Sequence, residues 1–299
     1  MIKQFWQFFH FILILILISG CKKQTDADFK YINELNEWHK KRVERLKADD
    51  GWLNLIGRFW LKKGDNSFGS SDKNDIVVSG KNIPDVMGIF LLKDGIVTLI
   101  SNKDVNIKLG DSSVTEIVMR DDLSGDIQYF SYNNIRWNLI NRDGKMGIRF
   151  RDLNNEAAKN FKGIERYPVD KEYKITAKFK PYPQPKIITI PTVLGTTTQD
   201  TSYGKIFFNL FDKEYTLEPI GKDRLFIIFA DETNSDETYG AGRFLYSDAP
   251  DSLGNVIIDF NKSYNPPCAL TKYATCPLPH KENFLSVKIE AGEKKYGEH

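Results

Sequence analysis

Two cysteines near the C-terminus, Cys268 and Cys276, are separated by seven residues in a proline-rich stretch that also contains His280. Their spacing fits a disulfide in an oxidising compartment, and closing a loop of about nine residues would stabilise the fold by roughly 2.6 kcal/mol. Two other chemistries stay open. His280 could assist a reactive thiol on Cys276, and the same side chains could bind zinc if two further ligands joined them. We predict the disulfide.

Polar side chains cluster around the same stretch and could form a ligand site. Tyr264 and Asn265 precede the first cysteine, and Asn283 follows the second. Loops held by a rigid scaffold often carry binding sites. Asparagines in irregular loops also bond backbone groups, which is the structural reading of the same cluster. The candidate ligand-site residues of this region are Asp259, Asn261, Tyr264, Asn265, His280, Asn283 and Glu293.

An aspartate and an arginine could meet across a hairpin further upstream. Asp231 follows the apolar run 225–229, and Arg243 precedes the next apolar residues. Such a pair is most often structural, but both residues are also candidates for the ligand site. Glycoside hydrolysis would need two carboxylates at a defined separation, and Asp231, Asp259 and Glu293 are available. No nucleophile elbow, zinc-protease or dinucleotide motif occurs, so no catalytic residue is assigned.

The charge balance excludes several classes of function. Lys and Arg total 42, Asp and Glu total 40, and the formal net charge is +2. A nucleic-acid binder would need a basic excess on one face, so no nucleic-acid partner is predicted. The chain has only four histidines, which argues against a site built from several of them. We predict no cofactor and no resident metal.

The first twenty residues have the layout of a secretory signal. Lys3 precedes the apolar stretch 5–18, which is shorter than the roughly 20 residues of a stable membrane-spanning helix. The sequence Ile18-Ser-Gly-Cys21 resembles the lipobox of bacterial lipoproteins. This resemblance implies cleavage before Cys21 and acylation of its thiol and new amine by palmitate-type chains, which anchor a protein stably. The alternative is an uncleaved signal anchor with an incidental cysteine.

The residue after the lipidated cysteine is Lys22 rather than Asp, the residue that favours inner-membrane retention in enterobacteria. The expected location is therefore the outer membrane of the cell envelope. Membrane lipid, held through acylated Cys21, is the expected partner.

The elements that carry these residues are mainly strands. Residues 28–47 contain no Gly or Pro and repeat apolar side chains at helical spacing, which predicts one amphipathic helix. Short alternating runs follow, and Asp94-Gly95 marks a hairpin. Closely spaced strands without long helices predict a mainly β fold with antiparallel, sandwich-like or barrel-like sheets in two halves. Strands are expected at 76–78, 88–92, 96–100, 105–109, 135–139, 148–150, 173–179, 187–190, 205–210, 215–217, 225–229, 243–246, 256–260 and 285–289.

The predicted division of the chain has four parts. Residues 1–20 form the signal peptide, 21–48 a tether with the amphipathic helix, 49–160 an N-terminal β domain, and 161–299 a C-terminal β domain that carries the cysteine loop. The proline-rich stretch 181–185 is expected to be a stiff connector between strands.

Several stretches together resemble the bacterial lipoproteins grouped as domain of unknown function 1684 (DUF 1684). The resemblance extends from about residue 30 to the C-terminus. It implies a secreted, usually lipidated protein, and it supplies no reaction. The stretches that carry it are residues 51–57, 59–61, 64, 68–69, 74–77, 148–152, 238–243, 259–261, 264–269, 276–279, 283 and 291–294.

Residues 61–99 also resemble a forkhead-associated domain, a β-sandwich that binds phosphothreonine. The family's phosphate-binding residues are not matched: Ser70 stands where the arginine belongs and Asn82 where the histidine belongs. No Asn-Gly follows Leu99. The resemblance implies the strand layout, and phosphothreonine recognition is not predicted.

The sequence therefore predicts a lipid-anchored cell-envelope protein whose role is binding or structural. The alternative is an envelope hydrolase or carbohydrate-active enzyme that uses carboxylates near the loop Tyr264–Cys268. A deep pocket with two of the candidate acids would favour the enzyme. A shallow surface with those acids paired to Arg149 or Arg243 would favour the binding or structural role.

Overall fold

A computed structural model describes residues 26–297 of the chain. The predicted signal segment 1–20 and the lipidation site Cys21 lie outside the described residues. The chain divides into two compact units, one that ends at Glu37 and one that starts at Trp38. Within residues 26–297, no helix combines the length and the apolar composition that a membrane crossing needs.

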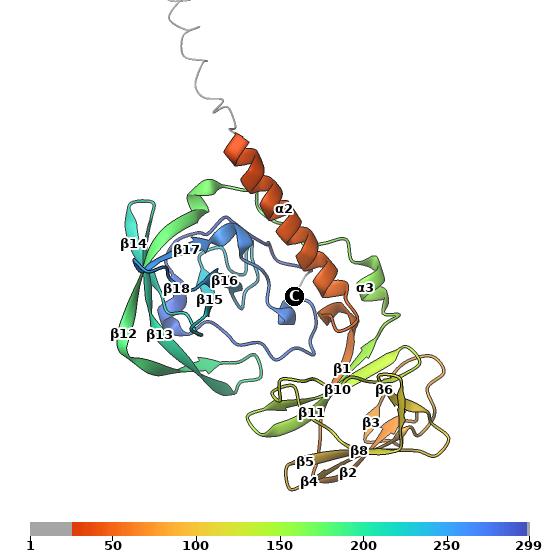
Figure 1. Ribbon diagram of the computed structural model, residues 1–299. Helices are drawn as coiled ribbons and strands as arrows, with labels where there is room; N and C mark the ends of the chain where they lie inside the picture. Colours follow the sequence, from red (N-terminus) through yellow and green to blue (C-terminus); the bar gives the residue numbers. More distant parts are fainter. Residues whose placement is uncertain (1–25, 298–299) are drawn as a thin grey trace, which may run out of the picture. The chain divides into compact units, whose positions relative to one another are not determined.

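The predicted amphipathic helix is present as α2, Asp26–Lys47 (Figure 1). It starts two residues before the expected position and has acidic residues in its first turn and basic residues in its last, as the helix dipole favours. In its second half, Leu46 is buried and Trp38 and Val43 are half-buried. A short second helix, α3, spans Glu156–Asn160.

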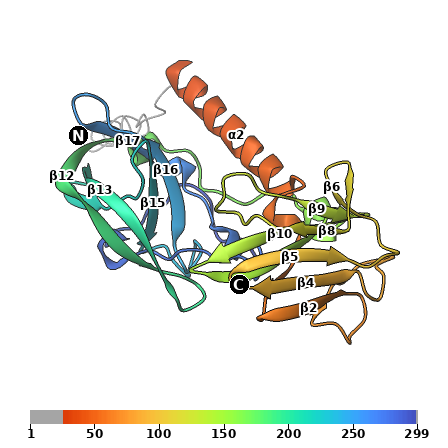
Figure 2. The ribbon, with the colours of Figure 1, turned by 60° about the horizontal axis from the view of Figure 1, so that its bottom comes forward.

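The strands up to residue 152 form two sheets, and Figure 2 shows β2, β4 and β5 of one of them side by side. The six-stranded sheet has the order β1-β11-β10-β9-β6-β7 and consists of β1 (Leu55–Trp60), β6 (Ile107–Leu109), β7 (Ser112–Val114), β9 (Phe130–Tyr132), β10 (Ile135–Arg142) and β11 (Lys145–Asp152). The five-stranded sheet has the order β3-β2-β4-β5-β8 and consists of β2 (Gly64–Gly69), β3 (Ile76–Val77), β4 (Gly88–Lys93), β5 (Ile96–Ser101) and β8 (Glu116–Val118).

Two-residue turns set the register of these sheets. Asp94 and Gly95 both have positive φ angles and join β4 to β5, and Asp143 and Gly144 join β10 to β11 in the same way. Positive φ at both central residues is the geometry that matches the twist of a hairpin, and Asp-Gly adopts it readily. The hairpin predicted at Asp94-Gly95 is therefore confirmed.

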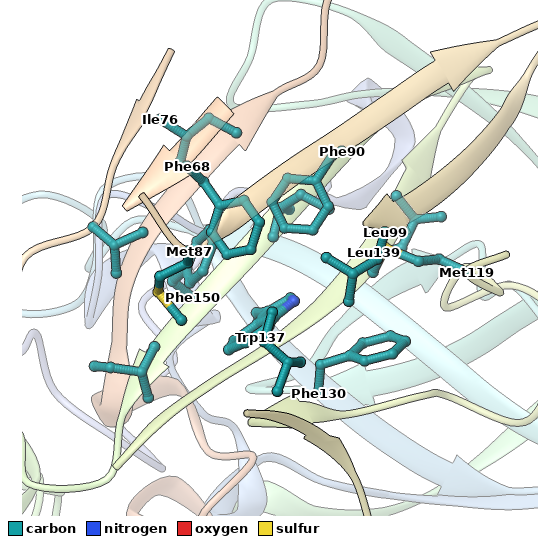
Figure 3. Packing of buried hydrophobic residues seen from close by; sticks show 14 of the residues in the cluster. Phe68, Ile76, Met87, Phe90, Leu99, Met119, Phe130, Trp137, Leu139 and Phe150 are labelled. Atoms are coloured by element: carbon teal, nitrogen blue, oxygen red, sulfur yellow. The ribbon is translucent and has the colours of Figure 1, made fainter. Parts of the chain in front are cut away.

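Aromatic residues fill the core of this first group of strands (Figure 3). Phe68, Phe90, Trp137 and Phe150 have no exposed surface, and the rings of Phe68 and Phe90 stack with their centres 4.3 Å apart. These residues come from strands of both sheets, so the core holds the two sheets face to face.

The strands after residue 173 form two further sheets with a separate core. A four-stranded sheet has the order β14-β13-β12-β17 and consists of β12 (Lys174–Pro191), β13 (Thr197–Leu210), β14 (Lys213–Leu217) and β17 (Asn255–Asp259). A three-stranded sheet has the order β16-β15-β18 and consists of β15 (Arg224–Asp231), β16 (Arg243–Asp248) and β18 (Phe284–Leu285). The mainly β fold with one N-terminal helix, predicted from the sequence, is confirmed.

Two local predictions were wrong. The proline-rich stretch 181–185 is not a connector but lies inside β12, where the register moves from Pro181–Gly204 to Lys186–Ser202. Prolines lack the amide donor of a ladder, and this stretch is the part of β12 where the pairing is interrupted. Only Leu285 of the expected strand 285–289 pairs as a strand, opposite Asp231 at the end of β15. Beyond it the ladder ends, and the Ile289 amide donates to the Asp231 side chain rather than to a strand backbone.

The buried indole of Trp137 provides a test of the first core. We expect Trp137→Ala to lower the free energy of unfolding by about 3–5 kcal/mol, because it leaves a large cavity. Trp137→Phe should cost clearly less, since the indole N–H has no hydrogen-bond partner among the described residues and its removal leaves no acceptor unpaired.

Urea unfolding followed by far-ultraviolet circular dichroism measures both variants. Leu123→Ala is the control, because Leu123 is 69% exposed and its truncation should change stability by less than about 0.5 kcal/mol. Equal losses for Trp137→Ala and Leu123→Ala would contradict the packing described above.

Candidate ligand-binding cleft

A fully buried ion pair joins the end of β15 to the start of β16. Nη2 of Arg243 lies 2.8 Å from Oδ2 of Asp231, and neither side chain is exposed. The two residues stand at the turn end of an antiparallel hairpin in which Phe229 is opposite Arg243. They pair as the hairpin geometry predicted.

The same pair binds the C-terminal segment. Arg243 donates to the backbone oxygens of Ile289, at 2.9 Å, and Ala291. Asp231 Oδ1 accepts from the amide of Ile289 at 3.1 Å and from the hydroxyl of Thr233 at 2.6 Å. A buried ion pair is stable when further hydrogen bonds satisfy both charged groups. These two side chains therefore fasten the chain rather than face a ligand.

A second buried carboxylate, that of Glu293, binds the helix. Its side chain is 1% exposed and accepts from Nε and Nη2 of Arg42, the latter at 3.1 Å. Glu293 also accepts from the amide of Asn265 at 2.7 Å, and Arg42 donates to the Asn265 backbone oxygen at 2.9 Å. Two-pronged arginine–carboxylate pairs are among the strongest hydrogen-bonded contacts in proteins. Glu293 thus ties the second half of α2 to the segment around Tyr264.

Five aromatic rings pack next to this contact, and we call them the aromatic wall. Neighbouring ring centres are 4.7 to 6.4 Å apart. Two guanidinium groups lie over the wall, Arg42 at 4.3 Å from the Tyr264 ring centre and Arg224 at 4.0 Å from that of Tyr246. The attraction between a cation and a π face contributes to both contacts. The wall consists of Trp38, Phe226, Phe244, Tyr246 and Tyr264.

The alternation of the β15–β16 hairpin explains the wall. Successive side chains of a strand point to opposite faces. One face of the hairpin is buried in the second core through Leu225, Ile227, Phe229 and Leu245. The opposite face therefore carries the pairs Phe226–Tyr246 and Arg224–Asp248, which stand directly across from each other.

A cleft of about 1080 Å³ is lined by the aromatic wall, the second half of α2 and β17. Both β16 and β17 are edge strands, each hydrogen-bonded to one neighbouring strand. The Ser247 hydroxyl donates to the Ile257 backbone oxygen at 2.8 Å and bridges the two edges. Pockets for small molecules typically measure about 300–1,000 Å³, so this cleft can hold a ligand of considerable size.

The cleft contains some of the residues selected from the sequence and excludes others. Asp259, Tyr264 and Asn265 line it. Asp231 and Glu293 do not, because each is buried against an arginine. The structure thus places one of the three candidate carboxylates in the cleft.

The remaining asparagines support backbone. Asn261 accepts from the amide of Asp170 at 3.0 Å and donates to its carbonyl at 2.7 Å. Asn283 accepts from the amide of Glu218 at 2.7 Å and donates to its carbonyl at 3.1 Å. His280 lies nearby, with Nε2 3.4 Å from the same Glu218 oxygen. These contacts match the structural reading of the polar cluster.

The two cysteines are neighbours and carry free thiols in the structure. The amide of Cys268 donates to Sγ of Cys276 at 3.1 Å. A hydrogen bond from Cys276 lowers the pKa of the Cys268 thiol, with the Tyr239 hydroxyl as a second donor, and the same contact raises the pKa of Cys276. No hydrogen bond joins His280 to either thiol among the described residues. The disulfide stays a prediction.

Three arginines from the first group of strands hold the loop between the cysteines. Arg58, Arg142 and Arg149 all donate to residues 274–275. Asp122 lies 2.7 Å from Arg142 and 4.0 Å from Arg149, so one carboxylate faces two of the three cations. Burial and the neighbouring charge of Arg142 lower the pKa of Arg149. The contacts fix the position of the loop.

Sequence reasoning missed most of the cleft. Trp38 and Arg42 lie in the helix predicted at 28–47, but no feature of the sequence marked either as part of a site. Arg224 directly precedes the predicted strand 225–229, and Tyr246 is the last residue of the predicted strand 243–246. Outward-facing aromatic and cationic residues at this spacing are the signal that could have found the wall.

Residues 159–294 match a family model described as "Protein of unknown function (DUF1684)". The match supports the DUF1684 family for this part of the chain. The resemblance noted in the sequence extended further, from about residue 30 to the C-terminus. It includes β12 to β18 and therefore most of the aromatic wall. The chain matches no curated protein.

Two solved structures are similar to parts of the chain. One is the solution NMR structure of an uncharacterised protein from Haloarcula marismortui, with 25% identity over 48% of this chain and 82% of that chain and a TM-score of 0.41. The other is the crystal structure of Mycobacterium tuberculosis Rv1747 FHA-1, with 16% identity over 33% of this chain and 95% of that chain and a TM-score of 0.22.

Removal of one partner tests the buried ion pair. We expect Asp231→Asn to lower the free energy of unfolding by about 3–5 kcal/mol, because the buried Arg243 charge loses its counter-ion. Urea unfolding gives the value. The matched control is Asp126→Asn, which breaks the exposed pair with Arg120 and should change stability by less than about 1 kcal/mol. A loss no larger than the control's would show that the pair contributes little.

Thiol labelling tests the predicted disulfide. Protein isolated from the envelope and denatured without reduction should offer no free thiol at Cys268 or Cys276. If the bond exists, Cys276→Ala should cost about 2–5 kcal/mol of stability. The double alanine variant should cost no more, because both changes remove one shared interaction. Two labelled thiols would instead favour the thiol alternatives.

Proposed function

We propose that the protein is a lipid-anchored binding protein of the cell envelope and that its ligand occupies the cleft. The anchor is Cys21, acylated after cleavage of the signal segment. The observation that carries the binding role is the cleft itself, which borders Tyr264, Asn265 and Pro267. This is the loop at which the sequence predicted a ligand site, and an aromatic wall beside charged groups is a typical lining of a small-molecule site.

The placement of the carboxylates favours binding over hydrolysis. A glycoside hydrolase needs two carboxyl groups on opposite sides of one bond. Asp231 and Glu293 are engaged by Arg243 and Arg42 and have no opening to the cleft. Asp259, which lines the cleft, also accepts from the amide of Asn261 and so caps the turn after β17. Of the three acids that the sequence offered for hydrolysis, Asp231, Asp259 and Glu293, Asp259 alone lines the cleft.

Mass spectrometry of the mature N-terminus tests the anchor. We expect the chain to start at Cys21 with acyl chains on its thiol and amine. Cys21→Ser should prevent acylation and leave the precursor uncut or released from the membrane fraction, because stable anchoring depends on those chains. An unmodified cysteine in the mature protein would contradict the lipoprotein assignment.

A thermal-shift screen tests the cleft. The mature, lipidated protein in detergent micelles is mixed with envelope sugars and short peptides. A ligand present at about 100 times its Kd should add roughly 2.7 kcal/mol of stability, which raises Tm by several degrees. The shift should disappear in Tyr246→Ala and persist in the control Phe284→Ala, whose ring is 62% exposed and does not line the cleft. A shift unaffected by Tyr246→Ala would place the ligand elsewhere.

A further inference from the structure

Six cationic and three acidic side chains line the cleft, and three of the six cations lie at ion-pair distance from an acid. Three carboxylates line it, and two of them are engaged locally. Asp251 accepts from the amides of Leu253 and Asn255 at 2.9 and 2.8 Å, and Asp259 lies 3.9 Å from Lys262. Six cationic side chains face them: Lys41, Arg42, Arg45, Lys174, Arg224 and Lys262.

Arg224 differs from the other two arginines of the cleft. Arg42 is neutralised by Glu293, and Arg45 pairs with Asp50. Arg224 has no carboxylate at ion-pair distance within residues 26–297, although Asp248 stands across from it in the hairpin. Its guanidinium carbon lies 4.0 Å from the centre of the Tyr246 ring, a cation–π contact.

This contact leaves Arg224 able to bind an anion. Arg224 is exposed, and none of its N–H donors has a hydrogen-bond partner within residues 26–297, so they are available to a ligand. The ring restricts the long side chain, so less freedom is lost when a ligand binds. A planar fork of donors matches a carboxylate or phosphate in a two-pronged contact. Arg224 is therefore a preorganised oxyanion receptor at the edge of the aromatic wall.

The aromatic wall favours a ligand with a ring. Phe226, Tyr246 and Tyr264 line the cleft, and a sugar ring has an apolar face that can contact them. Asn265 borders the cleft but has no exposed surface, and it donates through Nδ2 to the Lys294 backbone oxygen at 2.7 Å. Its buried Oδ1 atom is therefore out of reach of a ligand in the cleft.

On the premise that the cleft is the binding site, we propose that its ligand is a sugar-sized ring carrying one oxyanion, either a carboxylate or a phosphate. Arg224 binds the oxyanion, and the aromatic wall contacts the ring. A neutral sugar lacks the group that Arg224 recognises.

Three probes with the same ring test the proposal: D-glucuronate, D-glucose 6-phosphate and D-glucose. Isothermal titration calorimetry with the mature protein in detergent micelles measures each Kd. We expect at least one of the two anions to bind about tenfold or more tightly than glucose, the effect of one charge-assisted contact. Arg224→Gln should remove this preference. Arg224→Lys, which keeps the charge but loses the planar fork, should retain only part of it.

The matched control is Lys222→Gln, which removes the same charge two residues away from Arg224 at an exposed position outside the cleft lining. It should change the Kd of the anions by no more than about twofold, since exposed charges act weakly at a distance. Unchanged Tm values confirm that both glutamine variants are folded.

Three results would overturn the proposal. Equal affinity for glucose and both anions would exclude oxyanion recognition while leaving the cleft as a binding site. Equal weakening by Arg224→Gln and Lys222→Gln would show a general charge effect instead of a specific contact. Binding of none of the probes at about 10 mM would exclude this ligand class, and the thermal-shift screen then decides independently whether the cleft binds another ligand.

Discussion

The buried ion pair between Asp231 and Arg243 determines where the walls of the cleft stand. Both charges have lost their water, so each must be satisfied by the other and by backbone groups. The backbone groups that do this belong to the segment before Glu293. Once that segment is fixed, Glu293 is placed to bind Arg42, and Arg42 in turn stacks on the ring of Tyr264. A contact that faces no ligand thus positions, through two further steps, the helix and the aromatic ring that line the cleft.

A similar balance of charge governs the loop between the cysteines. Three arginines reach residues 274–275, and Asp122 is the carboxylate that faces two of them. Like charges held together are tolerated here because carbonyl and hydroxyl oxygens accept their hydrogen bonds. The loop is therefore held from the side of the first β-sheets, while Pro267, one residue before Cys268, lines the cleft. At the end of the loop, the Cys276 backbone oxygen accepts from the amide of Val193, just after β12, at 3.0 Å, so the second group of strands holds it too.

Local patterns predicted the elements better than the site. The period of the apolar residues predicted α2, and Asp94-Gly95 predicted a hairpin, because both depend on neighbours in the chain. The Arg42–Glu293 contact joins residues 251 positions apart, and no spacing in the sequence indicates it. Asp231 and Glu293 were selected from the sequence, but their roles depend on their partners Arg243 and Arg42. Tertiary packing determines those partners. The family resemblance predicted no chemistry, and the cleft is formed by residues from α2 and β15 to β17 that lie far apart in the sequence.

The proline stretch inside β12 controls which side chains of that strand are buried. Four residues, 182–185, stand opposite the single residue Tyr203 of β13. Before this bulge the buried position is the odd-numbered Ala177, and after it Ile188 and Ile190 are buried while Ile187 is 60% exposed. The three surplus residues invert the pleat, because side chains alternate with a period of two. In evolution, a change in the length of the bulge by two residues would preserve this inversion. A change by one residue would turn the apolar side chains of the hairpin beyond the bulge, residues 186–202, towards water.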